Sequence, residues 1–155
     1  MVEIYNMAGH LVRRLNQISV AIFADNMAAL GLDLTPVQFA ALSAIDAQPG
    51  IAQAALAGAI AYDQTTLGGV IDRLEQKQLV ARQVSPSDRR ARVLTVSEAG
   101  QELLAQVRPV VRALQGDILS GLDEAEAAQL MALLKKTTDA GNSRSRAPLS
   151  PRKPR

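Results

Sequence analysis

Residues 64–95 read QTTLGGVIDRLEQKQLVARQVSPSDRRARVLT, and this stretch decides the fold. From Gln64 to Lys77 apolar residues recur at helical spacing, which predicts an amphipathic helix with one buried face. That face is made of Leu67, Val70, Ile71 and Leu74. After the helix, two strand-like runs at 80–84 and 92–96 enclose a polar tip, and this pattern predicts a hairpin.

The opposite face of the helix carries short polar groups, bare backbone and one guanidinium, which suit the edges of bases in a DNA groove. Each glycine in an exposed helix lowers the stability of the helix by about 1 kcal/mol relative to Ala. Two adjacent glycines therefore indicate that something must come close to the backbone at this point. The helix N-terminus favours phosphate, and Arg73 is expected to bind phosphate or guanine. The candidate DNA-binding residues on this helix are Gln64, Thr65, Thr66, Gly68, Gly69 and Arg73. The alternative is a polar face that is simply solvated.

The hairpin tip carries a second set of candidates. We expect Arg90 to enter a minor groove, where narrow A·T tracts concentrate negative potential, and Arg89 and Arg92 to meet phosphates. Asp88 would be repelled by a duplex, so it is expected to pair with a neighbouring arginine and hold the tip in shape. The alternative is a solvent-exposed hairpin whose arginines serve solubility.

The preceding segment predicts the rest of a helix-turn-helix. Thr35 and Pro36 give an N-cap and a proline at the first helical position, starting a helix to about Ala47. A short helix from about Gln53 to Ile60 follows the break at Pro49-Gly50. Asp63 is then the expected N-cap of the helix that begins at residue 64.

Both ends of the chain predict long helices, at about residues 7–30 and across 98–138. Their apolar positions exceed what the central module needs, which implies a homodimer built from both ends. The last fifteen residues, 141–155, are rich in Ser, Pro and Arg, so we expect a disordered basic tail. It serves either plain solubility or auxiliary, nonspecific attraction to DNA.

Several of these stretches together resemble the MarR family of bacterial regulators. They are LTPVQFAAL (34–42), VIDRLEQKQLVAR (70–82), DRRARVLTVSEAG (88–100) and GLDEAEAAQLMALL (121–134). The D-x-R of the hairpin with the following LT is the most specific part. The chain departs from the family at Gln78, where Gly is common, and at Ala52, where a Ser or Thr cap is common.

The resemblance implies a mainly α fold with a small β-wing. A winged helix-turn-helix core at 35–96 would be flanked by dimerisation helices at 7–30 and 98–138, giving a single domain over 1–140 followed by the tail.

A polar stripe on the first helix is the candidate ligand site. His10, Arg13, Arg14 and Gln17 lie within about 100° of one another on that helix. The stripe is either a solvated basic face, a source of salt bridges between subunits, or an anion pocket between the dimer helices and the DNA module. The resemblance supports the pocket, because the family often binds small aromatic carboxylates or phenols there and releases DNA. Arg offers a carboxylate a bidentate partner, and Phe39 is core or pocket wall.

Composition excludes several kinds of site and several classes of protein. The chain has no Cys and one His, which excludes disulfides and thiol switches and makes structural zinc unexpected, so no cofactor or metal is predicted. No apolar run reaches the roughly 18 residues of a membrane span, and no signal peptide is apparent; a cytoplasmic protein without a membrane partner is expected. Residues 1–140 carry 12 basic and 15 acidic groups, yet residues 82–92 hold four arginines against one Asp. Positive charge is therefore concentrated at the wing.

The functional hypothesis is a bacterial transcription regulator, a repressor that binds a pseudo-palindromic operator as a homodimer and is released by a small aromatic acid or phenol. The alternative is a nonspecific architectural DNA-binding protein without an effector. An enzyme is not expected, because the sequence has no phosphate-binding glycine loop and no clustered carboxylates at catalytic spacing.

Overall fold

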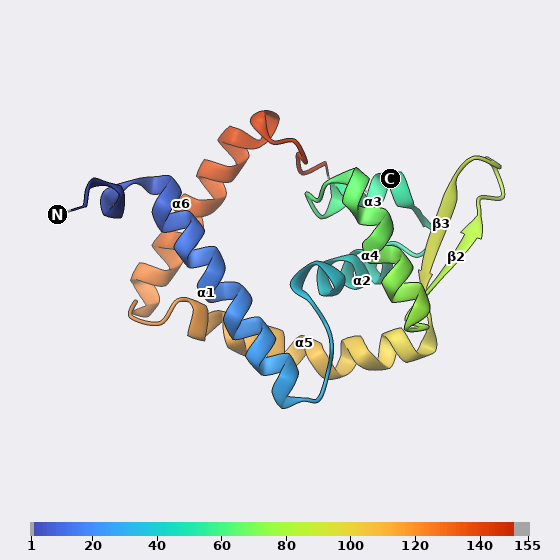
Figure 1. The fold of residues 1–155 in the computed structure, drawn as a ribbon, viewed down its shortest axis with the longest axis horizontal. Coiled ribbons are helices and arrows are strands. Elements are labelled where there is room, and N and C mark those ends of the chain that lie inside the picture. The colour runs from blue at the N-terminus through green and yellow to red at the C-terminus, as the bar shows by residue number, and fades with distance from the viewer. Residues whose placement is uncertain (1, 151–155) are drawn as a thin grey trace.

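A computed structural model describes residues 2–150 and shows a mainly helical chain with a small antiparallel sheet (Figure 1). The expected fold class is confirmed. The elements are η1 (Glu3–Asn6), α1 (Ala8–Ala29), α2 (Pro36–Ala47), β1 (Ile51–Ala52), α3 (Gln53–Ala59), α4 (Gln64–Gln76), β2 (Val80–Val84), β3 (Arg92–Val96), α5 (Glu98–Ile118), α6 (Glu124–Gly141) and η2 (Asn142–Arg144).

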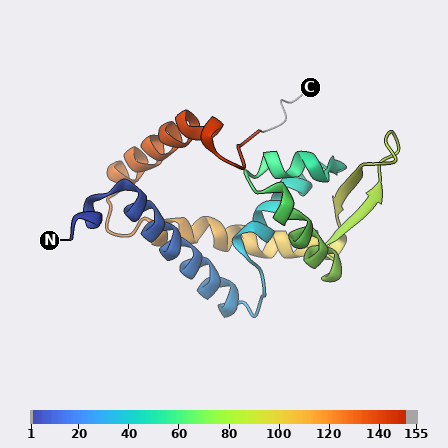
Figure 2. The same ribbon diagram turned by 45° about the horizontal axis from the view of Figure 1, so that its top comes forward.

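The long helix α5 joins two ends of the molecule. At one end α2, α3 and α4 gather beside the β2–β3 hairpin, and at the other the start of α1 lies near α6 (Figures 1 and 2). Helix α1 packs along α5, and α5 also contacts α2 and β3. The helix-turn-helix is thereby fixed to the terminal helices through α5.

The sheet contains one strand that the sequence did not predict. Its order is β1-β3-β2, and β1 pairs only Ile51 with Leu94 and Ala52 with Val93. The side chains of Ile51, Leu94 and Val80 are buried. These contacts fasten the base of the hairpin to the helical core, while its tip extends away.

The core is aliphatic and lies between α2, α4, α5 and the base of the sheet. The predicted face of α4 is confirmed, because all four of its apolar side chains are buried. The most deeply buried side chains of the described residues are Met27, Leu42, Ile45, Leu56, Leu67, Ile71, Leu74, Leu94, Leu104, Val107 and Leu114.

The helix caps predicted at Thr35 and Asp63 are present, and the structure adds one at Ser97. Thr35 and Gln38 form a reciprocal capping box at α2, with N···O distances of 3.2 and 3.3 Å. Asp63 caps α4, and Ser97 caps α5. These short-range hydrogen bonds explain why the helices begin where they do.

The turn after α4 adopts the conformation that a glycine would favour. Gln78 has a φ of 59°, in the left-handed region that is unfavourable for a residue with a Cβ. Its carbonyl accepts a hydrogen bond of 2.7 Å from the Ser97 hydroxyl, and the next carbonyl, of Leu79, accepts one of 3.0 Å from the Ser97 N–H. The start of α5 therefore holds this turn in place without a glycine.

The end of the chain differs from the expectation of disorder. Residues 142–150 form a 3-10 turn followed by a loop, and the Ser150 N–H donates a hydrogen bond of 2.8 Å to the Gly58 carbonyl. Composition did not reveal this contact, because Gly58 lies in α3, far away in the sequence. The remaining part of the predicted tail, 151–155, lies outside the described residues. Within 2–150, no helix is long and apolar enough to cross a membrane.

Candidate nucleic-acid interface

The N-terminus of α4 is held by a dense set of hydrogen bonds around Asp63. One carboxylate oxygen accepts from the Thr65 N–H at 2.8 Å and from the Thr65 hydroxyl at 2.6 Å, and the Thr66 hydroxyl donates to the Asp63 carbonyl at 3.1 Å. The hydroxyl hydrogen bond, then the backbone one, and then Arg146 lower the pKa of Asp63. Both threonine hydroxyl protons are used inside the cap, so these side chains present acceptor oxygens outward.

The exposed face of α4 leaves its backbone accessible. A Cβ at Gly69 would meet no atom within 4 Å, and one at Gly68 would lie at 3.9 Å from the Gln53 amide nitrogen. Neither glycine is needed for packing inside the chain. Gln64, Thr65, Thr66, Gly69 and Arg73 are all exposed, and Gly68 is half-buried.

The wing tip is shaped by backbone contacts. Asp88 does not pair with an arginine side chain, as the sequence reading expected; its carboxylate accepts the backbone N–H of Arg90 at 2.9 Å. A short Asp side chain reaches the N–H two residues on more readily than a distant guanidinium. Arg92 donates to the Arg89 carbonyl at 3.4 Å. The guanidinium of Arg90 is consequently free of Asp88.

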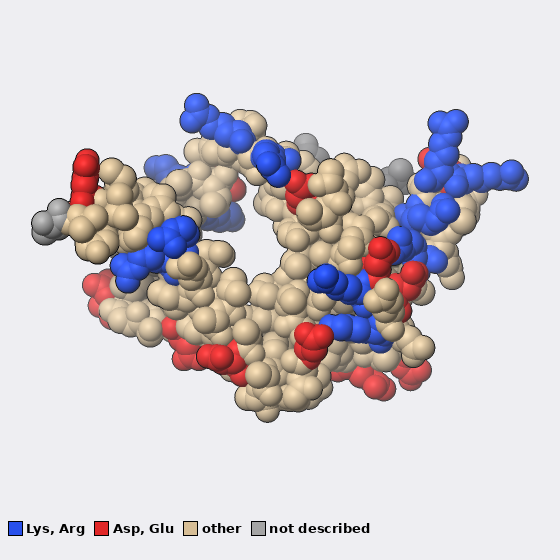
Figure 3. Space-filling model, viewed as in Figure 1, with Lys and Arg blue, Asp and Glu red and all other residues tan. Residues whose placement is uncertain are grey.

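All three wing arginines are exposed. In the space-filling view, blue side chains project from the end of the hairpin at the upper right (Figure 3). A positive tip of this kind is suited to the phosphates and minor groove of a duplex.

Arg82, on β2, has a structural role that the sequence did not predict. It forms an ion pair with Asp72 and lies at 3.7 Å from the Glu75 carboxylate, both on α4. Its side chain is only 20% exposed, so it is not one of the free cations of the wing. It neutralises acidic groups on α4 and ties the wing to that helix. Separations of seven and ten residues across a turn give no periodic signal that reveals these pairs.

A hollow of about 340 Å³ lies between α3, α4 and the wing. It brings Gln64 together with Arg90 and Arg92, and adds Gln53 and Arg82 to its walls. Three of the predicted DNA-binding residues thus share one concave surface. Arg73 lies in the last turn of α4 and Arg89 at the wing tip, and neither lines this hollow.

The predicted ligand residues separate into two places. His10, Arg13, Arg14 and Gln17 line a surface hollow of about 470 Å³ on the N-terminal half of α1, together with Tyr5. Phe39 is not part of it, and instead packs against Phe23 with ring centroids 6.2 Å apart. Phe39 therefore packs against the hydrophobic core. Its ring, on α2, faces Phe23 in the second half of α1, whereas the hollow lies on the first half of that helix.

Within the hollow, the Arg13 guanidinium has side-chain partners, and the Arg14 guanidinium has none among the described residues. Arg13 donates to the Gln17 side chain at 3.2 Å and lies at 3.3 Å from His10 Nδ1. Arg14 makes no hydrogen bond or ion pair with any residue in the described part of the chain. The Tyr5 and His10 rings lie 5.7 Å apart. An aromatic wall thus adjoins a cation that remains available for an anion.

A short helix, a turn and an exposed second helix, followed by an arginine-tipped hairpin, define a winged helix-turn-helix DNA-binding protein. The MarR family model matches residues 34–91. The chain is 32% identical over 138 residues to the transcriptional repressor NicR of Pseudomonas putida, covering 89% of this chain and 86% of that one. The chain belongs to the MarR family and is a transcriptional regulator.

Solved structures agree with this assignment. The chain is similar to the solved structure of BpsR from Bordetella bronchiseptica, with a TM-score of 0.82 and 32% identity over 90% of this chain and 98% of that one. DNA binding by BpsR is regulated by 6-hydroxynicotinic acid. A mutant MarR from E. coli complexed with operator DNA has a TM-score of 0.79 at 26% identity, covering 88% and 98%.

Proposed function

We propose that this protein is a repressor that binds a pseudo-palindromic operator as a homodimer and releases it on binding a small aromatic carboxylate or phenol. The observation that carries the proposal is the concave surface on which Gln64, Arg90 and Arg92 meet, together with the bare backbone at Gly68 and Gly69 on the same helix as Gln64. Helix α4 would enter the major groove, and the wing would reach the flanking minor groove. A regulator of this kind acts in the cytoplasm, on chromosomal DNA.

A homodimer would place two such surfaces on one duplex. Two α4 helices about 34 Å apart would enter successive major grooves, and the operator would share the two-fold symmetry of the protein. Affinity would fall steeply with salt, since the arginines displace counterions from phosphates.

Exposed apolar side chains on the terminal helices support the dimer. A groove of about 410 Å³ between α1, α5 and α6 is lined mainly by apolar residues, including Val12, Ile118 and Met131. The side chains of Val12 and Met131 are 58% and 54% exposed. A second copy of the chain would cover this surface and remove its apolar area from water.

The hollow on α1 supports an aromatic acid as effector. Arg14 would bind the carboxylate, and Tyr5 and His10 would contact the ring. The regulation of DNA binding in BpsR by 6-hydroxynicotinic acid favours this class of ligand. The effector would act only through a higher affinity for a dimer whose α4 spacing does not fit the grooves.

Operator binding is tested by selecting bound fragments from sheared host genomic DNA at physiological salt and sequencing them. We expect a few sites that share an inverted repeat. Even enrichment across the genome would instead favour the alternative, a nonspecific architectural DNA-binding protein without an effector.

Effector binding is tested with the selected operator and a panel of benzoates, hydroxybenzoates and hydroxynicotinates. One compound should release labelled operator, and Arg14→Gln should weaken that compound's binding at least about tenfold, as expected for a lost charge-assisted pair. Arg112→Gln, a charge loss at an exposed position on α5, is the matched control. Equal release in both variants would reject the role of Arg14.

A further inference from the structure

The chain after α6 folds back on itself before it reaches α3. We name residues 142–150 the C-terminal strap. Asn142 closes it with two reciprocal hydrogen bonds to Leu149: its amide nitrogen donates to the Leu149 carbonyl at 3.0 Å, and its amide oxygen accepts the Leu149 N–H at 2.7 Å. Both views show this segment running from the end of α6 towards α3 (Figures 1 and 2). The loop is therefore preorganised by one side chain.

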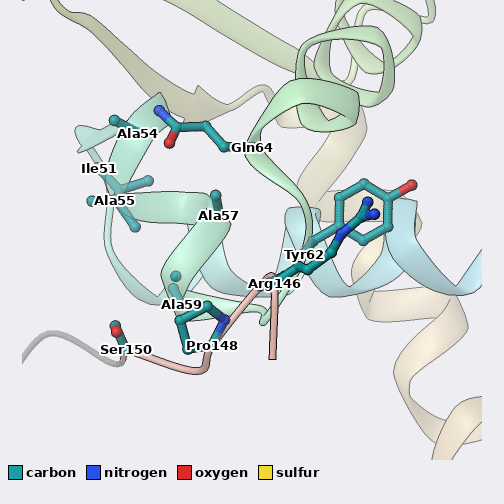
Figure 4. Close-up of a pocket in the computed structure, with 12 residues that line it drawn as sticks. Ile51, Ala54, Ala55, Ala57, Ala59, Tyr62, Gln64, Arg146, Pro148 and Ser150 are labelled. Carbon is teal, nitrogen blue, oxygen red and sulfur yellow. The ribbon is translucent and has the colours of Figure 1, made fainter. Parts of the chain in front are cut away.

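The strap contacts α3 at a glycine. The Ser150 N–H donates to the Gly58 carbonyl at 2.8 Å, and a Cβ built at Gly58 would lie only 3.1 Å from the Ser150 Cβ. A larger residue at position 58 would force the strap away. A hollow of about 530 Å³ lies between the strap and α3, and Pro148 and Ala59 line it beside this contact (Figure 4).

The strap also reaches the beginning of α4. The Arg146 guanidinium donates to the Asp63 carboxylate at 3.2 Å, using the oxygen that Thr65 leaves free. The Arg146 side chain is 91% exposed and that of Asp63 29%. Arg146 is the only charged residue that lines this hollow in the described structure. Figure 4 shows it extending from the strap on the same side of the hollow as Tyr62, just ahead of α4.

We infer that the C-terminal strap holds Arg146 at the edge of the DNA-binding surface, where this one side chain of the strap contacts a phosphate beside the N-terminus of α4. This inference rests on the proposed operator binding. The N-terminal residues of a recognition helix face the groove, and the groups that flank them face the bordering phosphates. Asp63 would repel such a phosphate, and Arg146 offsets its charge while most of the guanidinium remains accessible. The strap thus extends the interface beyond the helix and the wing.

The first test compares two arginines of the strap. Arg146→Ala should weaken operator binding about five- to tenfold and reduce the slope of log affinity against log salt by about 1. Arg144→Ala removes the same charge from a residue that makes no ion pair among the described residues, and should change affinity less than about twofold. Equal effects would overturn the inference, because the strap would then act only through its total charge. A gain in affinity for Arg146→Ala would also overturn it, and would identify the strap as inhibitory.

A second variant displaces the strap without removing a charge. Gly58→Leu gives α3 a better helix former and collides with Ser150. It should match the loss seen in Arg146→Ala, and the double variant should be no weaker than either single one. Additive losses would overturn the inference.

Hydrogen exchange provides a readout that does not depend on DNA. The amide of Ser150 should be protected in the natural chain and exchange rapidly in Gly58→Leu and in Asn142→Ala. An unprotected Ser150 amide in the natural chain would show that the strap does not dock. Failure of the proposed function is distinct from all these results: the natural chain itself would then show no preference for any operator.

Discussion

The winged helix-turn-helix buries the apolar face of its second helix, whereas the terminal helices leave most of their apolar side chains exposed. In α4 every residue of the apolar face is buried within one chain. In α6, an amphipathic sequence of 18 residues, no residue is buried, and α1 buries only Phe23 and Met27, near its end. From η1 to α1, and again in α6, large apolar residues are exposed: Ile4, Tyr5, Met7, Leu11, Val12, Ile18, Val20, Met131 and Leu133.

This difference distinguishes the helices that one chain stabilises alone from those that the proposed dimer would stabilise. A helix in a protein gains most of its stability from packing its apolar face. The DNA-binding module has that packing internally, through α2, α4 and the base of the sheet. The start of α1 and the whole of α6 do not, so in the proposed dimer their stability and the spacing of the two recognition helices should depend on the second subunit.

Disrupting the exposed apolar surface of the terminal helices should have the largest effect on operator binding. Val12→Asp places a charge in the groove lined by Met131 and should convert the dimer to a monomer, as measured by sedimentation velocity. Operator affinity should fall at least about a hundredfold, because the second half-site is then no longer bound intramolecularly. Circular dichroism should show that the module remains helical.

Val84→Asp is the matched control for that experiment. Val84 is 50% exposed on the wing strand β2, so the same change there should leave the dimer intact. A dimeric Val12→Asp variant would show that this groove is not the subunit interface, and the contrast between the two regions would need another explanation.

Breaking the wing should have the next largest effect. Arg90→Ala should weaken operator binding at least about tenfold, since a minor-groove arginine is lost, while the dimer remains. Fluorescence anisotropy with labelled operator measures the affinity, and sedimentation measures the dimer. Arg112→Ala, an exposed arginine on α5, removes the same charge outside the module and should cost less than about twofold. Retained affinity in Arg90→Ala would reject the groove role.

The adjacent glycines of α4 allow a finer test of the same contrast. Gly69→Ala fits the free protein, because nothing lies within 4 Å of the added Cβ, and it should stabilise the fold by about 1 kcal/mol. The same methyl group should obstruct the approach of DNA and weaken operator binding several-fold. Thermal melting and anisotropy on one preparation measure both quantities.

Gly116→Ala is its control. Gly116 lies near the end of α5 and also has open space around its Cβ, so a comparable gain in stability should come with unchanged operator affinity. Weaker DNA binding in both variants, or in neither, would contradict a specific approach of DNA to the α4 backbone.

The sequence predicted the features that are determined locally. The bounds of β2 and β3 and the caps at Thr35 and Asp63 depend on residues within a few positions of one another. The same is true of the buried face of α4, because hydrophobic periodicity is a local property. These elements place the candidate DNA-binding residues correctly on an exposed helix and an exposed hairpin.

The missed features depend on long-range pairing. Strand β1 consists of two residues that pair with β3 some forty positions later, and two residues give no periodicity. The pairing of Arg82 with Asp72 and the docking of Ser150 on Gly58 likewise depend on the assembled fold. Charge counting assigned Arg82 to the free positive charge of the wing, whereas the folded chain uses it to neutralise α4.

Changing the cap of α4 should have the smallest effect, on thermal stability. It tests whether the DNA-binding module is stabilised independently of the proposed dimer. The pKa of Asp63 is lowered below its ordinary value of 3.8, chiefly by the hydrogen bonds from Thr65. The charged form is therefore favoured in the folded state, and its contribution is fully present above that ordinary value. The contribution is lost as the pH falls through the lower, folded-state pKa.

Asp63→Asn keeps a capping oxygen but removes the titration. The natural chain should melt roughly a degree above Asp63→Asn near neutral pH, and the two should converge as the pH falls below 3.8 and through the lower, folded-state pKa of Asp63. Circular dichroism melts at matched protein concentrations measure the difference, and Asp117→Asn, at an exposed aspartate on α5, controls for net charge. If the difference persisted at low pH, the charge of Asp63 would not be its source. If it instead varied with protein concentration, the stability of the α4 cap would be coupled to subunit association, and the module would not be the self-contained unit that its buried face indicates.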